Sequence, residues 1–197
     1  KNLRVKLAES GLHEIDCISR HHSLEDLRAG VSGADFVFHL AGVNRPKDPS
    51  EFTEGNRGFT ESLCRVLRES GRTIPVAFTS STQAELENDY GRSKRQAEDA
   101  LLEYGKSTGS PVYLMRLTNV FGKWCRPNYN SAVATFCHNI ANGLPIEIHA
   151  ASSPLNLLYI DDLMTACLDL LSGSSPSGFI PTGPIYSTTV GEVADAL

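Results

Sequence analysis

A tyrosine and a lysine four residues apart, Tyr90 and Lys94, have the types and spacing of an acid–base pair. They open a segment with helical periodicity, in which residues four apart lie on one face, one turn from each other. A phenol has a pKa of about 10 and is a weak acid–base catalyst at neutral pH. A neighbouring ammonium lowers that pKa toward the working range. The pair predicts a tyrosine catalyst, although the same spacing occurs by chance on many exposed helices.

Two more polar residues are expected near this pair. Ser81 follows the apolar run at 76–80, which predicts a buried strand, so its hydroxyl is expected at the strand's carboxyl end, where parallel sheets bind ligands. The alternative is a serine-rich turn. Asn56 lies on the apolar stripe of the preceding predicted helix, where an amide must find partners. It is either a satisfied core amide or an anchor for a water or for the backbone near Lys94.

Strand and helix signals alternate along the whole chain and would position these residues. Strands are predicted at 14–20, 35–41, 76–80, 112–117 and 157–160, and helices at about 49–70, 90–104 and 131–142. Ser23 is expected to cap an early helix, and Asp161 or Asp162 a late one that runs through Leu171. This order predicts an α/β protein, a Rossmann-like doubly wound parallel sheet with a small C-terminal substrate-binding part.

Composition narrows the function classes. The 197 residues have a formal net charge of −5, 41% hydrophobic and 21% charged residues, as expected of a folded domain. No apolar run reaches the roughly 18 residues of a membrane span, and the acidic balance argues against nucleic-acid binding. The scattered cysteines and histidines predict neither disulfides nor a metal site. Cys64, Cys137 and Cys167 are expected to be buried, with Cys137 on the inward stripe of Val133, Phe136 and Ile140, and a cytoplasmic location fits.

The order of these features resembles the extended branch of the short-chain dehydrogenase/reductase superfamily, the NAD-dependent epimerase/dehydratase family. The resemblance rests on Asn56, Ser81 and Tyr90-x-x-x-Lys94, and on the motifs His39-Leu-Ala-Gly42, Arg116-Leu-Thr-Asn119-Val-Phe-Gly122 and Tyr159-Ile-Asp-Asp162. It covers essentially the whole chain, and that branch acts mainly on nucleotide sugars. Gly42-Val-Asn-Arg-Pro46 and residues 121–131 are further similar to the CapF-type enzymes of capsular polysaccharide synthesis.

The resemblance implies NADPH-dependent reduction of the 4-keto group of a UDP-linked 6-deoxy-N-acetylhexosamine. Tyr90 would deliver a proton to the sugar O4, Lys94 would lower the pKa of Tyr90 and bind the nicotinamide ribose, and Ser81 would hold the carbonyl oxygen. Asn56 would order the relay behind Lys94. The implied cofactor-binding residues also include Leu40, Ala41, Gly42 and Leu117, and the implied substrate-binding residues include Asn44, Arg45 and Asn119. The cupin domain that epimerises the sugar in CapF-type enzymes has no counterpart here.

Charge adds two expectations. A uridine diphosphate is anionic, so the loop with Lys123, Arg126 and Asn130 suits it, although a solvated loop face would have the same composition. The predicted strand at 14–20 ends at Arg20 with no acid, which favours NADP(H) over NAD(H). The alternative for Arg20 is a surface arginine without a ligand.

Two other functions stay open. A nucleotide-sugar 4-epimerase or dehydratase would use the same Tyr–Lys pair, but a dehydratase would need acidic groups just after Ser81, where the chain has Thr82-Gln83. A non-catalytic dinucleotide-sensing regulator that binds a partner protein would be expected to have lost part of the catalytic set, which is intact here.

The chain departs from the family pattern in two places. It has no G-x-x-G-x-x-G run, and Ser153-Pro-Leu-Asn156 stands where the family often has an arginine. Residues 1–7 resemble the interior of the first helix and residues 189–197 begin a new one, so we expect a fragment, or the ordered part, of a longer protein that has the missing first strand. The expected organisation is a dinucleotide-binding core at 1–120 and a substrate-binding part at 121–197, interleaved with the last core strands. Family analogy implies a homodimer.

Overall fold

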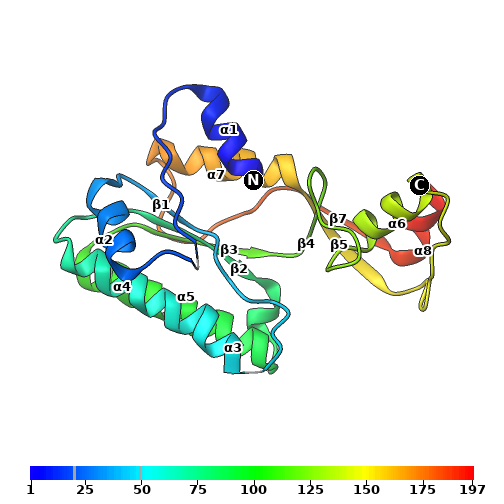
Figure 1. Cartoon of the computed structure of the whole chain (residues 1–197), viewed down its shortest axis with the longest axis horizontal. Helices are drawn as coiled ribbons and strands as arrows, with labels where there is room; N and C mark the ends of the chain where they lie inside the picture. The colour runs from blue at the N-terminus through cyan, green and yellow to red at the C-terminus, as the bar shows by residue number, and fades with distance from the viewer. Residues whose placement is uncertain (20, 49) are drawn as a thin grey trace. The chain divides into compact units, whose positions relative to one another are not determined.

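The computed structural model describes residues 1–19, 21–48 and 50–197, and the chain divides into two compact units (Figure 1). The large unit contains residues 14–116 and 169–181, and the small unit contains residues 1–13, 117–168 and 182–197. The two units therefore interleave along the sequence. The division into domains at 1–120 and 121–197 stays a prediction.

The large unit is built on a four-stranded sheet in the order β1-β2-β3-β6. Its strands are β1 (Val37–His39), β2 (Val76–Ser81), β3 (Val112–Leu117) and β6 (Gly178–Phe179); β1 is parallel to β2, and β3 is parallel to β6. Residues 76–78 and 112–115 are all buried, as expected of strands that are covered on both faces. This sheet confirms the predicted α/β class.

Three helices of the large unit lie on one side of this sheet (Figure 1). They are α2 (Leu24–Gly33), α4 (Phe59–Glu69) and α5 (Asp89–Thr108), and α5 runs beside α4 and contacts β2 (Figure 1). The core includes Leu67, Leu101 and Tyr104, whose hydroxyl donates to the carbonyl of Ile74 at 2.9 Å. The predicted cap at Ser23 is confirmed, because its side chain accepts from the backbone of Asp26 in a capping box.

The helix predicted at about 49–70 contains a π-helical segment, and residue 49 lies outside the described residues. Short α3 (Ser50–Phe52) leads into η1 (Thr53–Gly58) and then into α4. A Cβ at Gly55 would lie 2.3 Å from Cγ2 of Val43, so only glycine lets the loop after β1 approach this segment so closely. Such π segments are frequent at functional sites.

One predicted strand of the large unit is wrong. Residues 14–19 form no strand, and residue 20 lies outside the described part of the chain. In this stretch the half-buried side chains are Ile15 and Ile18, three residues apart. A half-buried strand needs a period of two, so the residues lack the alternation that would fix a strand against the sheet.

The small unit has a three-stranded sheet in the order β4-β5-β7. Strand β4 (Asn119–Phe121) is parallel to β5 (Pro154–Tyr159), and β7 (Ile185–Thr189) is antiparallel to β5. The helices of this unit are α1 (Asn2–Ser10), α6 (Ala132–Ala141), α7 (Ile160–Asp169) and α8 (Val190–Ala196), and a 3-10 turn, η3 (Leu170–Ser172), follows α7 in the large unit.

Two details of the small unit correct the sequence analysis. Helix α7 begins at Ile160, so Asp161 and Asp162 lie inside its first turn and do not cap it; acids there complement the helix dipole. On α6 only Phe136 is buried, whereas Cys137 and Ile140 are exposed, because the helix buries a narrower stripe than its apolar composition suggests. Cys64 and Cys167 are buried as predicted.

Within the described residues, no helix combines the length and the apolar character needed to cross a membrane. The same residues bring together no group of three or more His, Cys, Asp or Glu side chains with the spacing of a metal site.

Candidate active site

Lys94 is a buried ammonium at the centre of the site. It lies on α5, and its side chain is 4% exposed. Its Nζ donates to the backbone carbonyl of Thr79, near the end of β2, at 2.7 Å and lies 4.2 Å from the ring centroid of Phe78. Burial lowers the pKa of Lys94 to about 8, and the carboxylate of Glu98, one turn further along α5, opposes this shift. The side chain is therefore mostly charged at pH 7 and titrates just above it.

Tyr90 lies one turn before Lys94 and is half-buried. Its hydroxyl faces Ser81, and its ring packs 5.6 Å from the ring of Phe52. Burial raises the pKa of Tyr90, and the neighbouring Ser81 hydroxyl opposes the rise. The sequence analysis predicted the opposite direction, through Lys94; that prediction is wrong for this structure, in which the ammonium is directed at the carbonyl of Thr79. The phenol is protonated at neutral pH, which suits a proton donor.

Ser81 joins the end of β2 to the turn that follows it. It is the last residue of the strand, and its Oγ accepts from the backbone N–H of Gln83 at 3.2 Å, so that it caps the 3-10 turn η2 (Thr82–Glu85). The same hydroxyl faces Tyr90. The predicted place of Ser81, at the carboxyl end of a buried strand and beside the tyrosine, is confirmed.

Asn56 is a buried, fully used amide. Its Oδ1 accepts from the backbone N–H of Val43 at 2.8 Å, and its Nδ2 donates to the carbonyl of Val43 at 3.0 Å and to Oγ of Ser93 at 2.9 Å. The hydroxyl of Ser93 in turn donates to the carbonyl of Tyr90 at 2.7 Å. The amide therefore ties the loop after β1 to the turn of α5 that holds Tyr90 and Lys94.

The expected cofactor-binding backbone lies directly beyond β1. Leu40, Ala41 and Gly42 are exposed and follow the carboxyl end of the strand. A Cβ at Gly42 would lie 2.9 Å from Oδ1 of Asn56 and 3.6 Å from Nζ of Lys94. The glycine therefore leaves space over a buried ammonium that has two N–H donors besides the one that Thr79 accepts. This cradle fits the ribose hydroxyls of a dinucleotide.

The sequence analysis gave His39 no role of its own, and the structure makes it a core residue. His39 is 3% exposed, and its Nε2 lies 2.8 Å from Oγ1 of Thr60, whose hydroxyl donates to the carbonyl of Asn56. Burial, with a smaller contribution from the charge of Lys94, lowers the pKa of His39 to about 3. The neutral ring joins β1 to α4 and adds no charge to the site.

The expected cofactor and substrate residues do not all lie in the large unit. Asn44 and Arg45 are in the large unit, exposed in the loop after β1, and Arg20 lies outside the described residues. The small unit contains Leu117, Asn119, Lys123, Arg126 and Asn130, which lie at the end of β3 and in the segment that follows it. The roles of all eight stay predictions.

Both cationic side chains of the loop that follows β4 contact other residues of the small unit. Nζ of Lys123 lies 3.0 Å from Oδ2 of Asp161, which raises the pKa of the lysine. The guanidinium of Arg126 lies 5.3 Å from the ring centroid of Tyr129, and Asn130 is exposed. Lys123 is thus held by α7, which the sequence pattern of this loop does not indicate.

Comparison with known proteins accounts for this arrangement. Residues 2–178 match the model of the NAD dependent epimerase/dehydratase family. The chain belongs to this family. The predicted family resemblance is therefore confirmed. The description of the family as NAD dependent indicates a nicotinamide dinucleotide as the type of cofactor.

Individual relatives refine the comparison. The chain is 48% identical over 198 residues to the UDP-2-acetamido-2,6-beta-L-arabino-hexul-4-ose reductase of Pseudomonas aeruginosa, with 100% of this chain and 53% of the relative covered. It is 32% identical over 165 residues to UDP-glucuronate 4-epimerase 1 of Arabidopsis thaliana, with coverages of 72% and 38%. The crystal structure of the capsular polysaccharide assembling protein CapF from Staphylococcus aureus has a TM-score of 0.86 and 36% identity, and the match covers 98% of this chain and 53% of that one. The predicted similarity to CapF-type proteins is confirmed, and the chain spans about half the length of the reductase and of CapF.

Proposed function

We propose that this chain reduces the 4-keto group of a UDP-linked 6-deoxy-N-acetylhexosamine with NADPH. The observation that supports this most is the arrangement of three groups: Ser81 at the end of β2 faces a half-buried, protonated Tyr90, which lies one helical turn from the buried ammonium of Lys94. Within the family, the reductase from P. aeruginosa is 48% identical to this chain and carries a matching activity in its name.

In this reaction a bound nicotinamide would supply a hydride to C4 of the sugar, and Tyr90 gives its hydroxyl proton to O4, so that the ketone becomes an alcohol. The raised pKa of Tyr90 keeps that proton available at neutral pH. The Ser81 hydroxyl holds the carbonyl oxygen beside the phenol. Asn56 keeps the loop of Gly42 over the ammonium of Lys94, which would bind the nicotinamide ribose.

The cofactor would lie on the backbone of Leu40, Ala41 and Gly42, with Lys94 at its ribose and Leu117 beside it. We propose NADP(H) rather than NAD(H) from the basic character of Arg20. Comparing the dissociation constants of NADPH and NADH for the wild-type protein and for Arg20→Ala tests this choice. A variant that loses no preference for NADPH would remove the argument.

The UDP-sugar would be held by Asn44 and Arg45 and, at its diphosphate, by Asn119, Lys123, Arg126 and Asn130. At the diphosphate, Lys123 and Arg126 carry the positive charge that this anionic group requires. We further propose that the protein is located in the cytoplasm, where nucleotide sugars and NADPH are available. We also propose that it forms a homodimer, as many family members do.

A 4-epimerase is the second candidate, because the Arabidopsis relative carries that name. An epimerase reaction consumes no net reduced nicotinamide, whereas a reductase oxidises one NADPH for each sugar. The full chain is therefore mixed with NADPH and a UDP-4-keto-6-deoxy-N-acetylhexosamine, and the reduced-nicotinamide absorbance is followed. No turnover by folded protein with several 4-keto sugars would refute the reductase, and isomerisation of a 4-hydroxy UDP-sugar without loss of that absorbance would establish the epimerase.

A further inference from the structure

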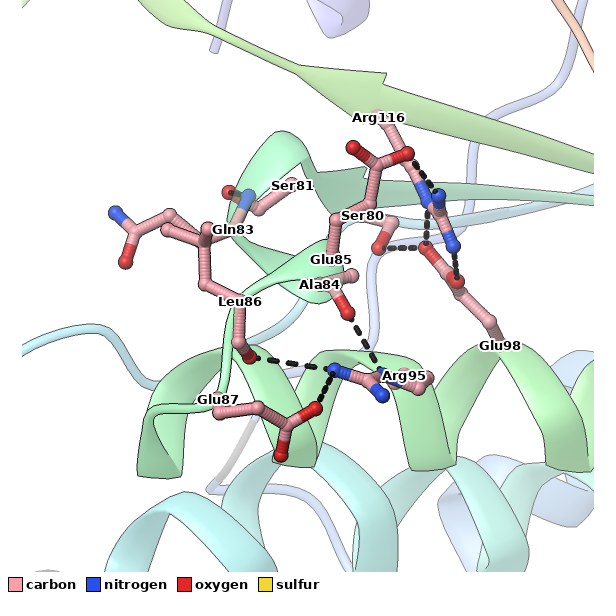
Figure 2. Close-up of polar contacts among 10 residues, drawn as sticks. All are labelled: Ser80, Ser81, Gln83, Ala84, Glu85, Leu86, Glu87, Arg95, Glu98 and Arg116. Atoms are coloured by element: carbon pink, nitrogen blue, oxygen red, sulfur yellow. Dashed lines mark hydrogen bonds and ion pairs between the residues drawn. The ribbon is translucent and has the colours of Figure 1, made fainter.

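The guanidinium of Arg116, on β3, joins two glutamates from different elements (Figure 2). Its Nε and Nη2 donate to the two carboxylate oxygens of Glu98 at 3.0 and 2.6 Å, and Nη1 donates to Glu85 at 2.7 Å. Its face lies 4.4 Å from the ring centroid of Phe179. A planar guanidinium matches a carboxylate in this two-point geometry, which a lysine cannot reproduce. The side chain is therefore held from α5, η2 and β6 at once.

The carboxylate of Glu98 connects α5 to the end of β2. It is 2% exposed and lies on α5 one turn after Lys94. It accepts a hydrogen bond from the hydroxyl of Ser80, the residue before Ser81 (Figure 2). A buried carboxylate needs a charged partner and hydrogen bonds to offset its lost hydration, and Arg116 and Ser80 supply these contacts. The network thus fixes the last residues of β2 against the helix of Tyr90.

The second carboxylate belongs to the turn that Ser81 begins. Glu85 is the last residue of η2, so its contact with Arg116 attaches this turn to β3. On the other side of the turn, Nε of Arg95 donates to the carbonyl of Ala84 at 2.7 Å, which attaches it to α5 (Figure 2). The position of the Ser81 hydroxyl therefore depends on the contact of the preceding residue with Glu98 and on the contacts of the following turn η2 with Arg116 and Arg95.

We propose that Arg116 is a positioning residue, which holds the Ser81 hydroxyl against Tyr90 through Glu98 and Glu85. In kinetic terms the inference rests on the proposed reductase function, because both hydroxyls must reach one carbonyl oxygen of the sugar. Arg116 contacts neither of the two hydroxyls and acts through the backbone of β2 and η2.

A double-mutant cycle between Arg116 and Ser81 tests this role in the full chain. We expect Arg116→Met to lower kcat at least about tenfold and to change the KM for NADPH by less than about twofold, because it misplaces a group used in the transition state. In a Ser81→Ala background the same substitution is expected to lower kcat by less than about threefold, because the hydroxyl that it positions is gone. Effects of the two substitutions that simply multiply would overturn the proposal.

A milder pair of variants covers the case in which Arg116→Met does not fold. Glu85 and Glu87 lie on or beside the same turn and have similar side-chain exposure, 69% and 74%, but Glu85 pairs with Arg116 and Glu87 pairs with Arg95. We expect Glu85→Gln to lower kcat about two- to fivefold, which fits the loss of one exposed ion pair. In a Ser81→Ala background, Glu85→Gln is expected to cause no further loss of kcat. Glu87→Gln is expected to leave kcat unchanged. Equal effects of Glu85→Gln and Glu87→Gln would contradict the role of Arg116.

A measurement without turnover separates this inference from the proposed function. The neighbouring Ser81 hydroxyl lowers the pKa of Tyr90, so misplacing Ser81 should raise it. Tyrosinate absorbance is followed against pH, with Tyr90→Phe as the reference that isolates this phenol. We expect ionisation of Tyr90 to move to higher pH in Arg116→Met or, if that variant does not fold, in Glu85→Gln; an unchanged titration would overturn the inference. Failure of the wild-type protein to reduce any 4-keto sugar would refute the reductase function. The titration of Tyr90 would still test whether Arg116 positions Ser81, because it needs no turnover.

Discussion

The charge of Lys94 sets an upper pH limit for the proposed reaction. With a pKa of about 8, the ammonium is about nine-tenths charged at pH 7 and about one-tenth charged at pH 9. Tyr90, whose pKa is raised, keeps its proton throughout this range. We expect kcat/KM, which reports the free enzyme, to be level up to about pH 7, to be halved near pH 8 and to reach about one-tenth of the plateau at pH 9.

Removing the negative charge of Glu98 should move this limit. The carboxylate raises the pKa of Lys94, so Glu98→Gln lets burial lower it further. The other charged or titratable groups that surround this pair are His39 from β1, which is neutral, Arg116 from β3, and Tyr90 on the same helix. Arg116, freed of its partner, acts in the same direction as burial. We therefore expect kcat/KM of the variant to decline at a lower pH than that of the wild type, whatever its value on the plateau.

The assay is the initial rate of NADPH oxidation at NADPH concentrations well below KM, which gives kcat/KM for NADPH, at a series of pH values, for wild type, Glu98→Gln and Glu103→Gln. Glu103 is an exposed glutamate on the same helix and serves as the matched control. It should leave the pH of the decline unchanged. A decline that stays at the wild-type pH in Glu98→Gln, or that moves equally in Glu103→Gln, would refute the assignment of the decline to Lys94.

Three further outcomes are expected. Tyr90→Phe should lower turnover about a hundredfold or more, as for the loss of a general acid, and change NADPH affinity less than twofold; retention of more than a few per cent of activity would exclude it as proton donor. Asn56→Ala should lower the free energy of unfolding by about 1–3 kcal/mol, measured by urea titration, because it leaves buried polar groups of Val43 unpaired; an unchanged midpoint would show that water replaces the amide. Cys137 should react with a thiol reagent in the native protein, whereas Cys64, whose pKa is raised to about 11 by burial, should react only on unfolding; equal rates would contradict the burial pattern.

Local patterns were sufficient for the elements that hold the reacting groups. The apolar run at 112–117 is a strand with the predicted bounds, and the segment from Tyr90 onward is a helix because its apolar positions recur at helical spacing. Ser81 and Asn56 lie where the order of strands and helices placed them. In each case the signal lies within one element and its immediate neighbours.

Features that depend on distant partners were not predictable in the same way. The pKa of Tyr90 is governed by burial and by the direction in which Lys94 points, which is set by a backbone carbonyl on β2. The pairing of Arg116 with Glu98 joins residues 18 positions apart, and no spacing rule indicates it. The strand predicted at 14–20 and the inward face predicted for Cys137 failed because apolar composition alone does not fix which side a segment buries.

The bond from Lys94 to the carbonyl of Thr79 has a consequence for engineering. The acceptor belongs to the main chain, so a substitution at position 79 exchanges a side chain that this contact does not use. The lysine's anchor is thereby protected from most single-residue changes, while its proton affinity stays adjustable from the side chain at position 98. Where the lysine sits and how strongly it holds its proton can therefore be varied separately in this scaffold.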